Sequence, residues 1–149
     1  MPGPDKGIAL PTLSRPARRR ILPSMIADGT PLAFIPCRDP AASRPFYEER
    51  LGLELMAEDD FALTFDGGGT PFRLTRVAGY TPPTWTVFGW EVSDLDAAVA
   101  ELASRGVGMA RYDNLEQDGT GIWTAPDGTR VAWFSDPDGN VLSLTEVEE

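Results

Sequence analysis

The stretch "WFSDPDGNVLSL", from Trp133 to Leu144, places a turn between two apolar runs. Its middle segment, Asp136 to Asn140, consists of residue types that turns favour. Proline fixes φ, glycine and asparagine tolerate positive φ, and aspartate can accept hydrogen bonds from its own backbone. The stretch therefore predicts a hairpin that joins strands at residues 130–135 and 141–146.

This hairpin ends the second of two similar halves of the chain. The halves begin with "LAFIPCRDPAASRPFYEERLGLEL" (32–55) and "VFGWEVSDLDAAVAELASRGVGMA" (87–110). Each starts with an apolar strand, and Asp39 or Asp94 then stands where a helix of about a dozen residues should begin, because aspartate is a good N-cap. Each helix is expected to stop at a glycine, Gly52 or Gly106, as helices commonly do.

The rest of each half also predicts strands. They lie at 54–58, 61–66 and 71–76 in the first half, and at 107–112, 121–125, 130–135 and 141–146 in the second. Apolar residues recur at helical spacing in both helices, with Leu95, Val99 and Leu102 as the clearest set. The pattern predicts an α+β fold of two βαβββ modules that bury their apolar faces against each other as one domain.

Composition limits the classes of function. The 149 residues suit one domain, and their net charge of −10 divides into +4 for residues 1–24 and −14 for residues 25–149. An acidic domain repels nucleic acid and anionic membrane surfaces. The single cysteine, Cys37, excludes an internal disulfide and suits the cytoplasm. We therefore expect a cytoplasmic protein that contacts neither nucleic acid nor a membrane.

Histidine is absent from the chain. Mechanisms that need an imidazole are therefore excluded, including Ser-His-Asp triads, His-paired cysteine nucleophiles and His-ligated metals.

The first 28 residues differ from the rest. Residues 1–24 are rich in proline and arginine and lack a sustained apolar period, which predicts a disordered extension. The alternative is a misassigned start, with translation beginning at Met25. The folded domain is expected at 29–149, with modules at about 30–77 and 84–147.

The elements "FYEERLGL", "SDLDAAVAEL" and "DPDGN", in this order, resemble the vicinal oxygen chelate superfamily. That superfamily includes glyoxalases, bleomycin resistance proteins and extradiol dioxygenases, and the resemblance covers about residues 30–147. It implies a cupped, incompletely closed barrel of paired modules, a homodimer, and a metal ion held in the cup.

The resemblance also gives the positions of the usual metal ligands. They correspond to Leu32 and Val87 in the opening strands, and to Arg73 and Ser143 in the closing strands. None of these is a usable ligand, since divalent metals in such sites take imidazole nitrogen or carboxylate oxygen. A serine at position 143, where relatives often carry glutamate, thus belongs to a site whose metal shell is missing. The sequence predicts a metal-free protein with no cofactor.

Strand alternation predicts what faces the cup instead. The expected lining is apolar and aromatic with a few polar groups, which is typical of a small-molecule pocket. The ligand-binding candidates are Phe34, Arg73, Trp85, Glu91, Tyr112 and Ser143. Alternatives remain open for some of them, because Trp85 can serve as a core or interface aromatic and Arg73 can turn to solvent or pair with Glu91.

Two functions follow from these expectations. The first is a metal-free binding protein of the bleomycin-resistance type, which holds a small organic molecule in the cup. The alternative is a metal-independent glyoxalase-like lyase or isomerase, in which Arg73 stabilises an enolate or carboxylate and Glu91 moves the proton. A metal enzyme with unforeseen oxygen ligands such as Glu91 is the third and least favoured interpretation.

Overall fold

The computed structural model describes residues 25–148, so the predicted disordered segment 1–24 lies outside the described residues. The chain divides at Pro31 into two units, of which Leu32–Glu149 is the larger. In the described part of the smaller unit, a single 3₁₀ turn, η1, spans Ile26–Asp28. No helix among the described residues is both long and apolar enough to span a membrane.

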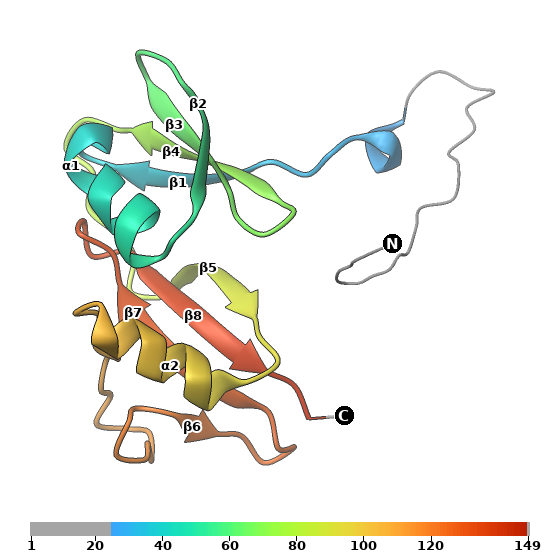
Figure 1. Cartoon of the computed structure of the whole chain (residues 1–149), viewed down its shortest axis with the longest axis vertical. Coiled ribbons are helices and arrows are strands. Elements are labelled where there is room, and N and C mark those ends of the chain that lie inside the picture. The colour runs from blue at the N-terminus through green and yellow to red at the C-terminus, as the bar shows by residue number, and fades with distance from the viewer. Residues whose placement is uncertain (1–24, 149) are drawn as a thin grey trace. The chain divides into compact units, whose positions relative to one another are not determined.

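The larger unit contains two modules with the same order of elements (Figure 1). The first module comprises β1 (Ala33–Cys37), α1 (Pro40–Pro45), η2 (Phe46–Arg50), β2 (Glu54–Glu58), β3 (Ala62–Asp66) and β4 (Pro71–Arg76). The second comprises β5 (Thr86–Glu91), α2 (Leu95–Ser104), β6 (Trp123–Thr124), β7 (Arg130–Ser135) and β8 (Val141–Glu146). The predicted α+β fold of two βαβββ modules is confirmed.

Each module forms one four-stranded sheet, in the order β1-β4-β3-β2 or β5-β8-β7-β6. The opening strand of each module pairs in parallel with its closing strand, and the other pairs are antiparallel. Helix α1 packs against β3 and β4, and α2 packs against β7 and β8. The hairpin predicted from "WFSDPDGNVLSL" is present, with Phe134 opposite Leu142.

Both predicted helix starts and stops are confirmed. The Asp39 carboxylate accepts a hydrogen bond from the Ala41 backbone N–H, and that of Asp94 accepts one from Ala97. Both glycines that follow the helical segments have positive φ, 72° at Gly52 and 85° at Gly106.

The first helix changes its winding at Pro45. Proline has no backbone N–H to donate, so the α-helical ladder is interrupted there. The next five residues form a π-helical turn, η2, closed by a 3.0 Å bond from the Leu51 N–H to the Phe46 carbonyl. This turn directs Phe46 and Tyr47 into the core.

The predicted strand at 107–112 is absent from the structure. Only Ala110 in this segment donates a backbone hydrogen bond to a strand, to the Trp133 carbonyl at 2.7 Å. The side chain of Gln117 takes the place of a strand partner, because it accepts from the Tyr112 N–H and donates to the Ala110 carbonyl. The edge strand next to β7 in this sheet is the two-residue strand β6.

The buried faces of both sheets share one apolar core. Ile35 and Cys37, predicted to lie beneath the first helix, are fully buried. Aromatic pairs join the modules, with ring centroids 6.4 Å apart for Phe46 and Phe134 and 5.2 Å apart for Phe72 and Phe88. Each module thus completes the core of the other.

A buried polar network lies at the β7–β8 turn. The Asp136 carboxylate is 5% exposed and accepts four hydrogen bonds. One oxygen accepts from the backbone N–H groups of Asp138 and Asn140, both at 2.9 Å. The other accepts from the Tyr47 hydroxyl at 2.6 Å and from the Asn140 amide at 2.8 Å. Tyr47 belongs to the first module, so this carboxylate links the two modules.

Two neighbours of Asp136 extend this network across to the first module. Asp138 accepts from the Arg38 backbone N–H and from the Ser43 hydroxyl, both at 3.0 Å. The Asn140 side-chain amide donates to the Pro36 carbonyl at 2.8 Å. The turn that connects β7 to β8 therefore also holds the end of β1 and the start of α1.

We predict that Tyr47→Phe lowers the free energy of unfolding by about 1–3 kcal/mol, since it removes a hydroxyl that bonds a buried carboxylate. Chemical denaturation followed by circular dichroism measures this change. Tyr112→Phe is the matched control, because no hydrogen bond of its hydroxyl is present among residues 25–148. Equal stability of Tyr47→Phe and the wild type would show that this bond contributes nothing.

Candidate functional site

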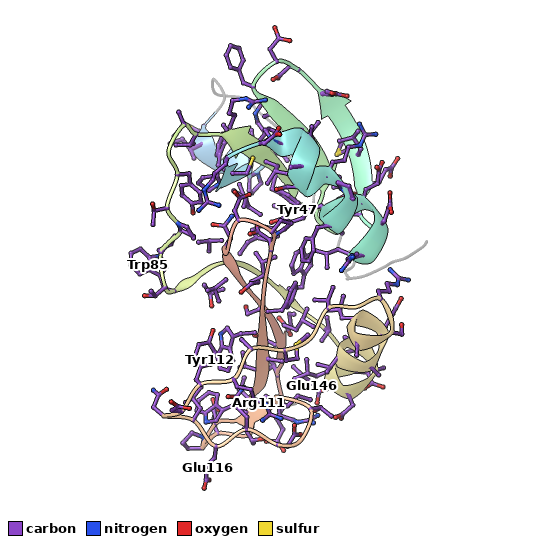
Figure 2. The ribbon with its side chains drawn as sticks, turned by 90° about the vertical axis from the view of Figure 1, so that its left-hand side faces the viewer. Tyr47, Trp85, Arg111, Tyr112, Glu116 and Glu146 are labelled. Atoms are coloured by element: carbon purple, nitrogen blue, oxygen red, sulfur yellow. The ribbon has the colours of Figure 1, made fainter. Side chains whose placement is uncertain are left out.

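The second sheet has one buried face and one open face. Ala132 and Phe134 of β7, with Leu142 and Leu144 of β8, are buried on the side that α2 covers. The intervening side chains are half-buried and lie on the other face, because successive strand residues alternate. Figure 2 shows Tyr112 and Trp85 on the side of this sheet away from α2.

Three aromatic rings gather on the open face. The Tyr112 ring meets Trp133 edge to face, with centroids 5.6 Å apart and an interplanar angle of 89°. The Trp123 ring also lies near Trp133, with centroids 6.2 Å apart and an interplanar angle of 36°. We call Tyr112, Trp123 and Trp133 the aromatic cluster. Of these three residues, only Tyr112 is predicted from the sequence as a ligand-binding residue. The alternation along β7, which places Trp133 directly opposite Ser143, could have found the centre of the cluster.

Ser143 lies beside the cluster and above a glycine. It pairs with Trp133 on β7 and with Gly89 on β5. A Cβ atom built on Gly89 would overlap the Ser143 hydroxyl oxygen and approach the Ser143 carbonyl to 2.9 Å. The strand therefore needs glycine at this position, and the serine hydroxyl occupies the space that a side chain at 89 would take.

The other predicted site residues lie elsewhere. Phe34 and Arg73 are cross-strand partners in the first sheet, where Phe34 is 58% exposed. Trp85 precedes β5 and is 70% exposed. Glu91 is an exposed residue at the end of β5. Of the six candidates, the structure thus groups Tyr112 with Ser143 around Trp133.

Arg73 has a different partner from the one considered in the sequence analysis. Its guanidinium donates to the Asp59 carboxylate at 2.9 Å, within the first module, and a longer contact of 3.5 Å reaches the Thr64 hydroxyl. The possible pair with Glu91 is therefore wrong. Backbone hydrogen bonding from Phe61, followed by the Arg73 contact, lowers the pKa of Asp59.

The residues at the positions of the superfamily's metal ligands do not fit the metal ion that the resemblance implies. The four positions that correspond to the superfamily's ligands carry two aliphatic side chains, an arginine already paired with Asp59, and Ser143. Across residues 25–148, no three Cys, Asp or Glu side chains gather in a group that could hold a metal ion. The chemistry of the open face is instead that of aromatic contact with a few hydroxyl groups.

The sequence matches the family model of the Glyoxalase/Bleomycin resistance protein/Dioxygenase superfamily over residues 29–144. The chain belongs to this superfamily. No protein with a curated description matches it.

Solved structures share the fold. A superfamily member from Sphaerobacter thermophilus has a TM-score of 0.63 and 27% identity, over 80% of this chain and 97% of that one. TnmS3, an antibiotic binding protein from Streptomyces, has a TM-score of 0.61 and 27% identity, over 84% of this chain and 100% of that one. A lactoylglutathione lyase from Agrobacterium tumefaciens, with a TM-score of 0.61 and 16% identity over 79% and 92%, is similar in fold alone.

Cys37 is the one thiol of the chain, and it is fully buried. Burial, reinforced by the negative charges of Asp138 and Asp136, raises the pKa of this thiol from 9.0 to about 12. We predict that a disulfide reagent at pH 8 modifies native protein at least about 100-fold more slowly than protein unfolded in guanidinium, because the thiolate is the reactive form. Comparable rates would show that the thiol is accessible in the folded state.

The same shift predicts a pH dependence of stability. The native thiol stays protonated above pH 9.0, where the unfolded thiol ionises, so the stabilisation is complete below pH 9 and is lost as the pH rises toward 12. The free energy of unfolding should fall by about 1 kcal/mol between pH 9 and 10 from this group. Urea titrations at both values measure the fall, and Cys37→Ala should reduce it.

Proposed function

We propose that this protein binds a small organic molecule on the open face of its second sheet and that it does so without a metal ion. The aromatic cluster is the observation that carries the proposal. Two tryptophans and a tyrosine in contact offer flat apolar surface, and such surface is used to recognise aromatic or extended apolar ligands. The antibiotic binding function given for TnmS3 supports this class of activity.

Ser143 defines the polar part of the proposed site. A carboxylate at this position would add charge beside Trp133, whereas a serine hydroxyl offers one donor and two acceptor positions to a neutral group. The proposed ligand is therefore a mostly apolar, aromatic molecule with a carbonyl or hydroxyl group that can reach this oxygen. Binding of this kind sequesters the ligand and needs no turnover.

The alternative function, a metal-independent lyase or isomerase, needs Arg73 and Glu91 to act on one substrate. Arg73 lies in the first sheet and forms an ion pair with Asp59, whereas Glu91 lies in the second sheet. The ion pair would have to break before the guanidinium could stabilise a developing anion. These contacts favour the binding function over the lyase.

We predict that tryptophan fluorescence titrations with planar aromatic antibiotics and bleomycin give saturable, stoichiometric binding of at least one of them, unchanged by EDTA. Trp133→Ala should then weaken binding about tenfold or more, because about 1.4 kcal/mol of stacking and apolar contact is lost. Trp90→Phe is the matched control, since Trp90 packs against Phe88 and the shared core. Binding that disappears in EDTA, or that survives Trp133→Ala unchanged, contradicts the proposal.

We also propose that the cup is completed by a second copy of the chain. Phe34 and Trp85, which the sequence analysis placed in the cup, are 58% and 70% exposed in the single chain. Exposed aromatic side chains of this size are typical of interfaces.

Analytical ultracentrifugation should accordingly find a dimer at micromolar concentration, and Phe34→Glu should shift it toward monomer because the charge would be buried in the interface. The same substitution leaves the core untouched and should keep the thermal midpoint of the dilute monomer. A wild-type monomer at every concentration would refute the dimer.

A further inference from the structure

The described residues enclose a pocket whose lining contains none of the residues of the aromatic cluster. Its volume is about 500 Å³, within the range of small-molecule sites. The first helical segment contributes Pro45, Phe46 and Arg50 to its lining. The segment after α2 contributes Gly106, Val107, Gly108 and Ala110, and the end of β7 with the following turn contributes Ser135, Asp136 and Pro137. We call this cavity the inter-helix pocket.

Among residues 25–148, Arg50 is the only basic residue that lines this pocket. Within the part of the chain that the structure describes, its guanidinium makes no ion pair or hydrogen bond. Arg105, the corresponding residue at the end of the other helix, has two hydrogen-bond partners by comparison. It pairs with Glu101 at 2.7 Å and donates to the Arg50 carbonyl at 3.1 Å.

The glycine after α2 places the Arg50 guanidinium against the pocket wall. A Cβ built on Gly106 would lie 3.3 Å from an Arg50 guanidinium nitrogen. The reverse contact also exists, since a Cβ on Gly52 would lie 3.3 Å from an Arg105 nitrogen. Each helix therefore ends with its arginine over the glycine that ends the other. Arg105 is held by Glu101 and the Arg50 carbonyl, whereas the Arg50 guanidinium has no such partner among residues 25–148.

Neutral donors lie in the same pocket. Because residues 107–112 form no strand, the Gly108 backbone N–H has no protein acceptor among residues 25–148. The Ser135 hydroxyl is likewise without a hydrogen bond in that range. The carboxylate of Asp136 also lines the pocket, but its oxygens accept four hydrogen bonds from the buried network.

We propose that the inter-helix pocket binds a small organic carboxylate with a compact apolar body. The carboxylate pairs with the Arg50 guanidinium, which presents a planar fork that matches two carboxylate oxygens. Gly108 and Ser135 supply further donors. Phe46, Pro45 and Val107 provide apolar surface for the body of the ligand. This site is independent of the function proposed for the aromatic cluster.

The test uses the full chain labelled with ¹⁵N and titrated with phenylacetate, with the neutral phenylacetamide as the paired probe. Phenylacetate should produce saturable shifts of the backbone signals of Gly106, Gly108 and Ala110, and phenylacetamide should not. Arg50→Gln should weaken phenylacetate binding about tenfold, in keeping with loss of a charged hydrogen bond. Arg105→Gln is the matched control and should leave the affinity within about twofold.

The proposal is overturned by the absence of saturable shifts with phenylacetate, by equal binding of phenylacetamide, or by an affinity that Arg50→Gln does not change. Arg50 also lines a neighbouring groove of about 240 Å³ that contains Leu53 and Leu102, so shifts confined to these two residues would place the ligand there and would also overturn the proposal. Trp133→Ala should leave phenylacetate binding intact, so failure of this site and failure of the proposed function can be distinguished.

Discussion

The fold depends on one buried carboxylate, that of Asp136. It lies in a turn of the second module, yet one of its four hydrogen bonds comes from Tyr47 of the first. A buried charge is costly unless it is fully hydrogen-bonded, so the turn, the tyrosine and the asparagine beside it must take up this arrangement together. Burial raises the pKa of Tyr47 and of the neighbouring Cys37 thiol, and the negative charge of Asp136 adds to both shifts, at Cys37 after that of Asp138.

This link leaves the opposite faces of the sheets available for other uses. The modules are joined through their apolar sides and through the turn, so the side chains of the other faces do not carry the fold. The Trp133 side chain is half-buried against Tyr112 and Trp123, and it makes no hydrogen bond within residues 25–148. Substitutions on a face that does not contribute to the core can change its binding chemistry without changing the fold.

Much of the fold could be predicted from local patterns. The helix boundaries can be recognised from the sequence, because N-capping and positive φ depend on the local residue type. Asp39 and Asp94 mark the starts, and the glycines after each helix mark the ends. The segment 107–112 could not be predicted, since its apolar pattern resembles a strand and its true partner is the Gln117 side chain.

The candidate site, like the fold, could be predicted from the sequence only where local patterns determine it. Alternation correctly suggested that Ser143 lies on the open face, but the partner of Arg73 is Asp59, which only the β2–β3 turn brings near. The free guanidinium of Arg50 could not be foreseen, because it follows from the unequal surroundings of two residues with similar positions in their modules.

The crossed contacts at the helix ends have a practical consequence. Arg50 over Gly106, and Arg105 over Gly52, are the same contact made twice, as in a dimer of identical subunits. A contact that repeats itself in this way is the kind through which one module could pair with a second copy of itself. The connection between the modules then serves mainly to raise their local concentration, and a chain cut between 77 and 85 would retain the information needed for the two halves to reassemble.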